Sequence, residues 1–143
     1  MQPCGECTLC CTLFPVRWLE KPINTPCVHC DAGCMIHETK PAECSDFNCA
    51  YTQMAKENIN LRPDKCGIIF EKLSSELRYG TVVPGMEISE SAHRQIANFL
   101  AQGFSVVLSA IDKKDNCFAI NEAHDEGHIR AQFRELVDGY LQH

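Results

Sequence analysis

Cysteine is concentrated at one end of the chain, and its spacing indicates metal binding. Nine of the eleven cysteines lie between residues 4 and 49. The CxxC spacing, in which two thiolates can close on one ion, occurs three times. Thiolates bind soft and borderline metals because sulfur is polarisable and the ligand is anionic. The predicted metal ligands are Cys4, Cys7, Cys10, Cys11, Cys27, Cys30, Cys34, Cys44 and Cys49.

The adjacent pair Cys10 and Cys11 suggests more than one metal ion. Neighbouring side chains point in different directions, so two such thiolates rarely bind the same ion. A tetrahedral zinc site needs four ligands, and nine cysteines exceed one site. We therefore expect zinc, in more than one ion, with the early and late cysteines interleaved around shared metals. An iron–sulfur cluster is the alternative, because it also uses four cysteines and CxxCxxC resembles part of a ferredoxin motif.

Histidine, basic and aromatic side chains in the same segment could also take part in the metal site. His29 and His37 could each replace a sulfur, although a histidine beside a metal more often faces solvent. Arg17 and Lys40 could balance thiolate charge, or could equally be surface cations. Two aromatic residues either shield the metals from water or form a local core: Trp18 and Phe47.

Composition narrows the class of protein. The formal net charge is -6 and no run of Lys or Arg occurs, which disfavours binding to a phosphate backbone. The N-terminus has neither the basic start nor the apolar core of a secretory signal. The longest apolar stretch, residues 104–111, is too short to span a bilayer. We expect a cytoplasmic protein with no nucleic-acid or membrane partner, in a compartment where clustered cysteines bind metal or do redox chemistry rather than form disulfides.

The chain divides at about residue 62. Residues 1–62 hold five prolines in their first 50 positions and few large apolar residues, so a metal would have to supply much of their folding free energy. Residues 63–143 are expected to form an α+β region, and the whole chain one compact domain. Cys66 and Cys117 each open a predicted strand and are expected to be small buried residues.

Periodicity predicts the elements of the second region. A short helix is expected over residues 52–60. Strands are expected over residues 66–73, 76–83, 104–111 and 117–120, and helices over residues 89–102 and 127–141. This order predicts a small antiparallel sheet with helices on one face, against which the irregular, metal-stapled cysteine-rich half packs.

The cysteine motifs resemble those of a known family. The segments CGECTLCC and CVHCDAGCMIHETKPAECSDFNC are similar to the CxxCxxCC family, also called the YkgJ family, of bacterial cysteine-cluster proteins described as zinc- or iron-chelating. The similarity covers about half of the chain. It implies metal binding without supplying a reaction. Two positions depart from the family pattern: His37 replaces an aromatic residue, and Lys40 replaces an arginine, which keeps the charge and loses the bidentate fork.

The predicted function is therefore metal binding. We expect zinc or iron in a multi-cysteine cluster with a structural or metal-handling role, and a protein partner remains open. The alternative is an iron–sulfur electron-transfer protein, which would leave room for an oxidoreductase-type role. Other enzymatic activity is disfavoured because the sequence contains no GxSxG, P-loop or dinucleotide-binding motif, and no CxxC pair follows a predicted strand.

Overall fold

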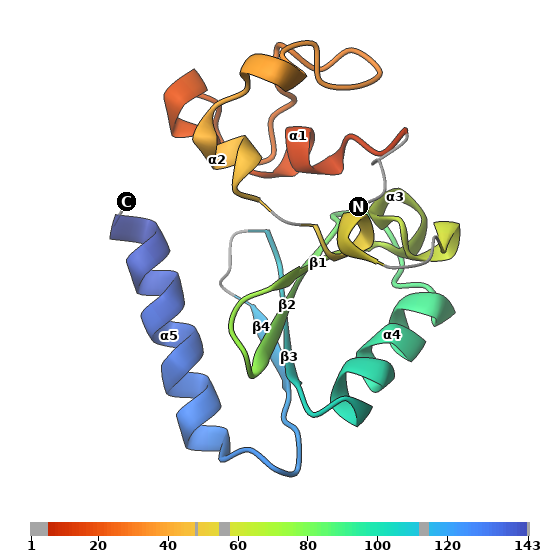
Figure 1. Ribbon diagram of the computed structural model, residues 1–143, viewed down its shortest axis with the longest axis vertical. Helices are drawn as coiled ribbons and strands as arrows, with labels where there is room; N and C mark the ends of the chain where they lie inside the picture. Colours follow the sequence, from red (N-terminus) through yellow and green to blue (C-terminus); the bar gives the residue numbers. More distant parts are fainter. Residues whose placement is uncertain (1–5, 48, 55–57, 112–114, 143) are drawn as a thin grey trace.

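The protein is an α+β structure built around one four-stranded sheet. The computed structural model describes residues 6–47, 49–54, 58–111 and 115–142, with side chains to residue 139. Cys4, one of the predicted ligands, lies outside the described residues. The strands stand in the order β1-β2-β3-β4 and comprise β1 (Ile68–Lys72), β2 (Leu77–Val82), β3 (Ser105–Ser109) and β4 (Asn116–Ala119). Figure 1 shows the sheet between the two longest helices.

The expectation of an antiparallel sheet is wrong for the central pair of strands. β1 with β2, and β3 with β4, form antiparallel pairs as predicted. β2 and β3 run parallel, with Leu77 opposite Ser105. The chain between these two strands forms α4 (Glu90–Ala101). This crossover carries the chain back to the end of the sheet at which β2 began, so β3 runs in the same direction as β2. The sheet is therefore mixed.

The expectation that the helices share one face is also wrong. α4 packs on one face, where Phe99 contacts the side of the sheet that carries Phe70 and Val106. α5 (Glu126–Gln142) packs on the opposite face. There its Ile129 and Phe133 pack with three strand residues, Leu77, Tyr79 and Val107. Because successive strand residues point to opposite faces, the consecutive apolar residues of β1 and β3 supply a core on each side.

Short 3-10 helices replace the helix expected over residues 52–60. Among the described residues of this stretch, η3 (Ala50–Gln53) and η4 (Ile59–Leu61) are separated by extended backbone at Met54 and Asn58. The side chain of Asn58 accepts a hydrogen bond from the N–H of Asn60, a local bond that competes with a continuous helix. α3 (Pro63–Cys66) then leads into β1.

The two isolated cysteines differ from each other. Cys66 is fully buried, as predicted, and its thiol lies 3.2 Å from the carbonyl oxygen of Ile68. It belongs to α3 rather than to a strand. Cys117 is exposed, and the expectation that it is buried is wrong, because β4 is an outer strand of the sheet.

The first part of the chain forms a lobe of short elements at one end of the sheet (Figure 1). We call residues 6–47 and 49–53 the cysteine lobe. Before η3 it contains α1 (Leu9–Leu13), η1 (Arg17–Leu19), η2 (His37–Thr39) and α2 (Ala42–Ser45). Leu13 anchors the lobe by packing with Ile69 and Val83.

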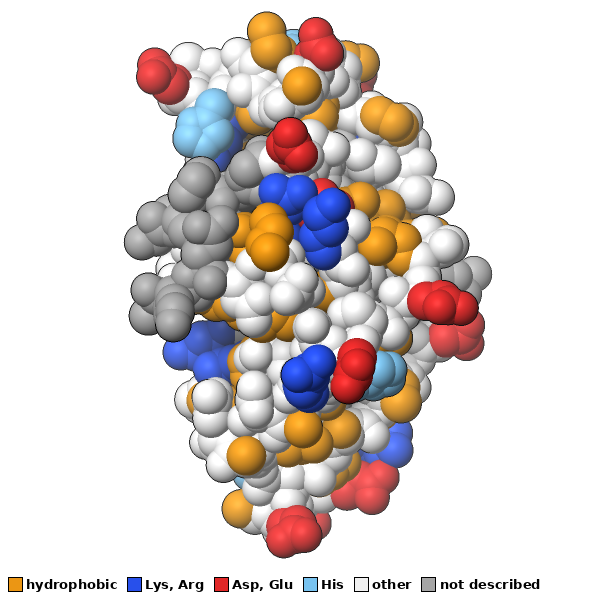
Figure 2. All heavy atoms as spheres, turned by 90° about the vertical axis from the view of Figure 1, so that its right-hand side faces the viewer, with side chains coloured by type: hydrophobic (Ala, Val, Ile, Leu, Met, Phe, Trp, Pro, Cys, Tyr) orange, Lys and Arg blue, Asp and Glu red, His pale blue; other side chains and the backbone are white. Residues whose placement is uncertain are grey.

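Several large apolar side chains of the cysteine lobe face solvent. Trp18 is 73% exposed and Val28 is 90% exposed. Hydrophobic side chains are visible at this end of the molecule in Figure 2. The lobe therefore gains little stability from a core of its own. No helix in the described part of the chain is long and apolar enough to cross a bilayer.

Candidate metal centre

The described cysteines of the lobe form two groups. The seam group lines a hollow between the lobe and the sheet and consists of Cys7, Cys10 and Cys49. The loop group lies within the loops and short helices of the lobe and consists of Cys11, Cys27, Cys30, Cys34 and Cys44. Cys10 and Cys11 are neighbours in α1 and interact electrostatically, so this adjacent pair joins the two groups.

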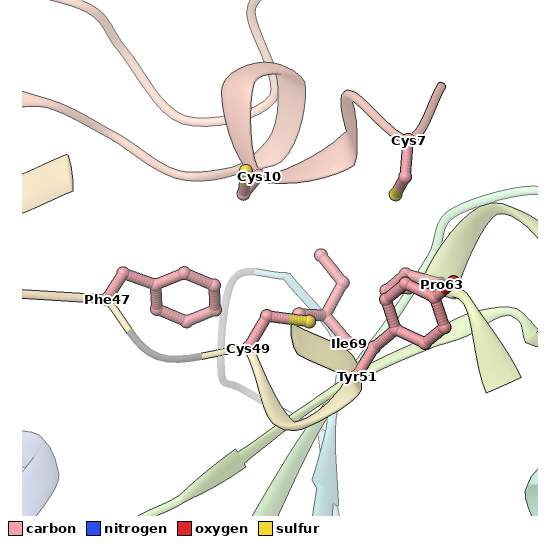
Figure 3. A pocket seen from close by; sticks show the side chains of 7 residues that line it. All are labelled: Cys7, Cys10, Phe47, Cys49, Tyr51, Pro63 and Ile69. Atoms are coloured by element: carbon pink, nitrogen blue, oxygen red, sulfur yellow. The ribbon is translucent and has the colours of Figure 1, made fainter. Parts of the chain in front are cut away.

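The seam group surrounds a hollow of about 20 Å³. Cys7 and Cys10 approach it from the α1 side, and Cys49 approaches from the side of β1 (Figure 3). The other lining residues are mostly apolar: Phe47, Tyr51, Pro63 and Ile69. This volume holds one water-sized occupant. The hollow therefore suits a single ion rather than an organic substrate.

Cys49 is fixed to the sheet through its backbone. It forms an isolated antiparallel bridge with Glu71 along the outer edge of β1. Its carbonyl oxygen accepts hydrogen bonds from the N–H of Thr52 at 3.0 Å and from the hydroxyl of Thr52 at 2.8 Å. A cation shared by Cys49 and the cysteines near α1 would join the lobe to the sheet.

Backbone contacts bring the loop group together from three segments. The N–H of Cys27 donates to the carbonyl of Cys11 at 2.9 Å. Cys30 and Cys34 face each other in an antiparallel bridge, closed by a turn in which Ala32 has a left-handed backbone (φ 54°). Cys44 is carried by α2 and lies within electrostatic range of Cys11, Cys27 and Cys34.

The thiols of the loop group are close enough to disfavour one another's ionisation. The hydrogen bond to Cys10 is the main cause that raises the pKa of Cys11 far above its usual value, and burial and the charge of Cys10 add to it. Burial, followed by the charge of Cys11, raises the pKa of Cys30 and of Cys44. A cation that binds here must therefore displace protons.

Lys21 is buried beside the loop group, at 7% exposure. Its ammonium donates to the carbonyl oxygens of Thr12 at 3.2 Å, Pro22 at 3.3 Å and Phe14. Burial lowers the pKa of Lys21, and four neighbouring thiols oppose this shift: Cys27, Cys11, Cys10 and Cys44. The sequence offered Arg17 and Lys40 as charge-balancing residues and gave no sign of Lys21.

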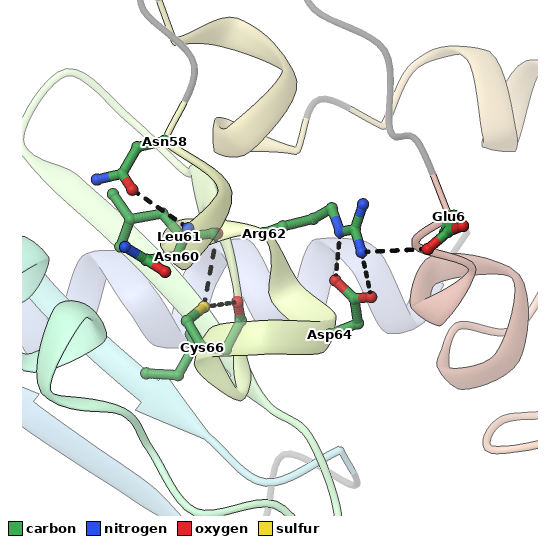
Figure 4. A network of polar contacts seen from close by, with 8 residues as sticks. Glu6, Asn58, Asn60, Leu61, Arg62, Asp64 and Cys66 are labelled. Atoms are coloured by element: carbon green, nitrogen blue, oxygen red, sulfur yellow. Dashed lines mark hydrogen bonds and ion pairs between the residues drawn. The ribbon is translucent and has the colours of Figure 1, made fainter.

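Arg62 is buried beside the seam group, also at 7% exposure. Its Nε and Nη2 donate to the two carboxylate oxygens of Asp64 at 2.6 and 2.8 Å, and Nη2 lies 4.0 Å from Glu6 (Figure 4). The bond to Asp64 is the main cause that raises the pKa of Arg62, and the charge of Cys7 contributes. Arg62 therefore connects α3 to the segment that carries the first seam cysteine.

The residues considered as auxiliary ligands or shields lie in different surroundings. The ammonium of Lys40 lies 3.4 Å from the Nε2 of His37; the side chain of His37 is exposed and that of Lys40 is half-buried. His29 is half-buried, and its carbonyl accepts a hydrogen bond from Met35. Phe47 does cover the seam group, since it lines the hollow and packs on Phe14.

The donor chemistry of both groups fits a soft or borderline metal, but the sulfurs are not yet in coordination geometry. As they stand, no three Cys, His, Asp or Glu side chains of the described ranges are arranged to hold a metal ion. Metal binding would therefore require the sulfurs of a group to move into coordination geometry.

Comparisons of the chain with protein-family models, with curated proteins and with solved structures returned no match. The similarity of the cysteine motifs to the CxxCxxCC family therefore stays a prediction.

Proposed function

We propose that this protein binds metal ions, with zinc as the first candidate, through the cysteines of the lobe. The observation that supports this most is the collection of eight described thiols into two groups that meet at Cys10 and Cys11. Each group contains at least three sulfurs from segments separated in the sequence. Two groups suit two ions better than one.

The packing of the lobe favours metal over free structural thiols. A free cysteine usually acts as a small buried hydrophobe, as Cys66 does here. The thiols of the seam and loop groups are only partly buried, and large apolar residues of the lobe face solvent. The thiols therefore add little to a hydrophobic core of the lobe. A bound metal would supply the missing folding free energy.

The two proposed ions would have different effects. An ion in the seam group would connect α1 to the edge of β1 through Cys49, which is a structural role. An ion in the loop group would hold together the turn of Cys30–Cys34 and α2. Both ions would thus have a structural or metal-handling role. A protein partner would bind to another part of the surface.

Measuring the metal content of the purified protein tests the proposal that the lobe binds metal. Protein purified anaerobically without added metal should be colourless and contain about two zinc ions per chain, as two four-ligand sites would require. Cys27→Ser and Cys49→Ser should each lose metal, and Cys117→Ser, which changes an exposed cysteine far from both groups, should not. A brown protein with acid-labile sulfide would support the iron–sulfur electron-transfer alternative. Less than one metal ion per chain, with free thiols, would rule out metal binding.

A further inference from the structure

Two cations are buried in the described part of the chain, and each lies beside one cysteine group. Lys21 and Arg62 are the charged residues found in the interior of that part. The ammonium of Lys21 donates at 3.2 Å to the carbonyl oxygen of Thr12, the residue that follows Cys11 of the loop group, and Arg62 lies within electrostatic range of Cys7 of the seam group. Burying a charge is costly unless an opposite charge or a set of hydrogen bonds compensates it.

The two cations differ in how they are compensated. Arg62 forms a bidentate ion pair with Asp64, so the pair carries no net charge. Lys21 instead donates to three carbonyl oxygens, and no Asp or Glu of the described residues forms an ion pair with it. Its positive charge is therefore unpaired within the described protein. The nearby groups that can become anionic are thiols, with Cys27 and Cys11 contributing most.

We propose that the ammonium of Lys21 is the built-in counter-charge of the loop group and sets how tightly this group holds a divalent cation. This inference rests on the proposed function. Four thiolates around a divalent ion carry two net negative charges, and the ammonium offsets one of them. Of the described seam cysteines, Cys10 alone acts on Lys21, and the cation beside Cys7, Arg62, is already neutralised by Asp64. The two groups therefore differ in net charge when loaded.

Neutral substitutions separate the charge of Lys21 from its hydrogen bonds. Lys21→Gln keeps N–H donors for the carbonyls and removes the charge, whereas Lys21→Met removes both. Zinc affinity is measured by competition with a chromophoric chelator at one pH. It should fall about tenfold or more in both variants, because the lost charge interaction is worth ~1.4 kcal/mol, which corresponds to a tenfold change in affinity. Lys21→Arg should recover most of the affinity. Recovery in Lys21→Gln would mean that Lys21 acts only through hydrogen bonds, and would overturn the proposal.

Two controls locate the effect. Lys40→Met removes a half-buried cation of the same lobe and should leave zinc affinity unchanged. The loss caused by Lys21→Gln should persist in a Cys49→Ser background, which lacks a seam ligand, and should shrink in a Cys27→Ser background, because the counter-charge then has fewer thiolates to act on. An equal loss in both backgrounds would contradict the assignment of Lys21 to the loop group.

A measurement on metal-free protein keeps this inference distinct from metal binding itself. Alkylation by iodoacetamide at one pH, mapped by mass spectrometry, reports how readily each thiol becomes a thiolate. Lys21→Gln should slow alkylation of Cys11 several-fold, because the charge of Lys21 favours the Cys11 thiolate, and should leave Cys49 unchanged. If the wild-type protein takes up no zinc, the proposed function fails, and the alkylation result alone decides the role of Lys21. Unchanged alkylation would then overturn it.

Discussion

The carboxylate of Glu43 binds the backbone of Trp18. Its Oε1 accepts a hydrogen bond from the N–H of Trp18 at 3.0 Å, although the two residues are 25 positions apart. Its Oε2 accepts from the N–H of Arg17 at 3.1 Å. One side chain of α2 therefore holds the start of η1, and this contact ties two parts of the cysteine lobe together without a metal.

We expect Glu43→Ala to loosen the turn that carries Trp18. The backbone N–H groups of Arg17 and Trp18 would lose their partner, which leaves η1 held mainly by local bonds. Trp18 is the only tryptophan, so a fall in the steady-state fluorescence anisotropy would report the change directly. Glu38→Ala, which alters an exposed carboxylate in η2, should leave the anisotropy unchanged; an equal fall in both variants would contradict the assignment.

Asp64→Asn should destabilise the protein by about 1–3 kcal/mol. The change leaves the buried guanidinium of Arg62 with only the exposed carboxylate of Glu6, at 4.0 Å, as a charged partner, and a buried charge that loses its close ion pair is destabilising. Urea denaturation of metal-free protein measures the effect. Glu90→Gln breaks the exposed ion pair with Arg94 and should cost less than about 0.5 kcal/mol. Similar losses in the two variants would show that Arg62 is not held as described.

Gly80→Ala should destabilise the sheet. A Cβ at this position would lie 2.7 Å from a methyl group of Leu108 and 2.8 Å from one of Ile68, both beneath α4. Overpacking of this kind costs roughly 1–3 kcal/mol. Gly139→Ala, in α5 with no atom within 4 Å of the added Cβ, should instead stabilise by about 0.5–1 kcal/mol. Thermal unfolding of the pair should move the midpoint in opposite directions.

Metal-free, reduced protein should lose stability above about pH 9. Folding raises the pKa of Cys30 and Cys44, mainly through burial, from the ordinary value of 9.0. The folded state therefore holds these protons more tightly than the unfolded state. The resulting stability is present below pH 9.0 and is lost as the pH rises towards the folded pKa. Urea midpoints between pH 7.5 and 10.5 test this. Cys44→Ser should flatten the fall and Cys117→Ser should not; a profile that is flat in the wild-type protein would contradict the prediction.

Local signals made most elements of the second region predictable. Ser89 caps α4, where its hydroxyl accepts from the N–H of Ala92 at 3.1 Å, and Gly103 follows the helix as expected. The parallel pairing of β2 with β3 was not predictable in this way, because it depends on contacts between residues distant in the sequence. The consecutive pairs Ile68–Ile69 and Val106–Val107 did carry a signal that both faces of the sheet are buried.

The candidate site was predictable in its residue types and less so in its surroundings. The adjacency of Cys10 and Cys11 predicted more than one metal ion, and this stays a prediction. The burial of Lys21 gave no sequence signal, because a lysine between Glu20 and Pro22 resembles a surface residue. Its position depends on three carbonyl oxygens that converge only after the loop folds. Arg62 likewise becomes a site residue only through tertiary packing.

The bridge between Cys49 and Glu71 also has a consequence for timing during synthesis. The cysteine lobe leaves the ribosome first, but its anchor on β1 is made some twenty residues later, and β1 itself pairs with β2. Chains grow at about 5–20 residues per second. For seconds, therefore, the thiols of the nascent lobe have no sheet to pack against. The seam group can be completed only after β1 and β2 have left the ribosome.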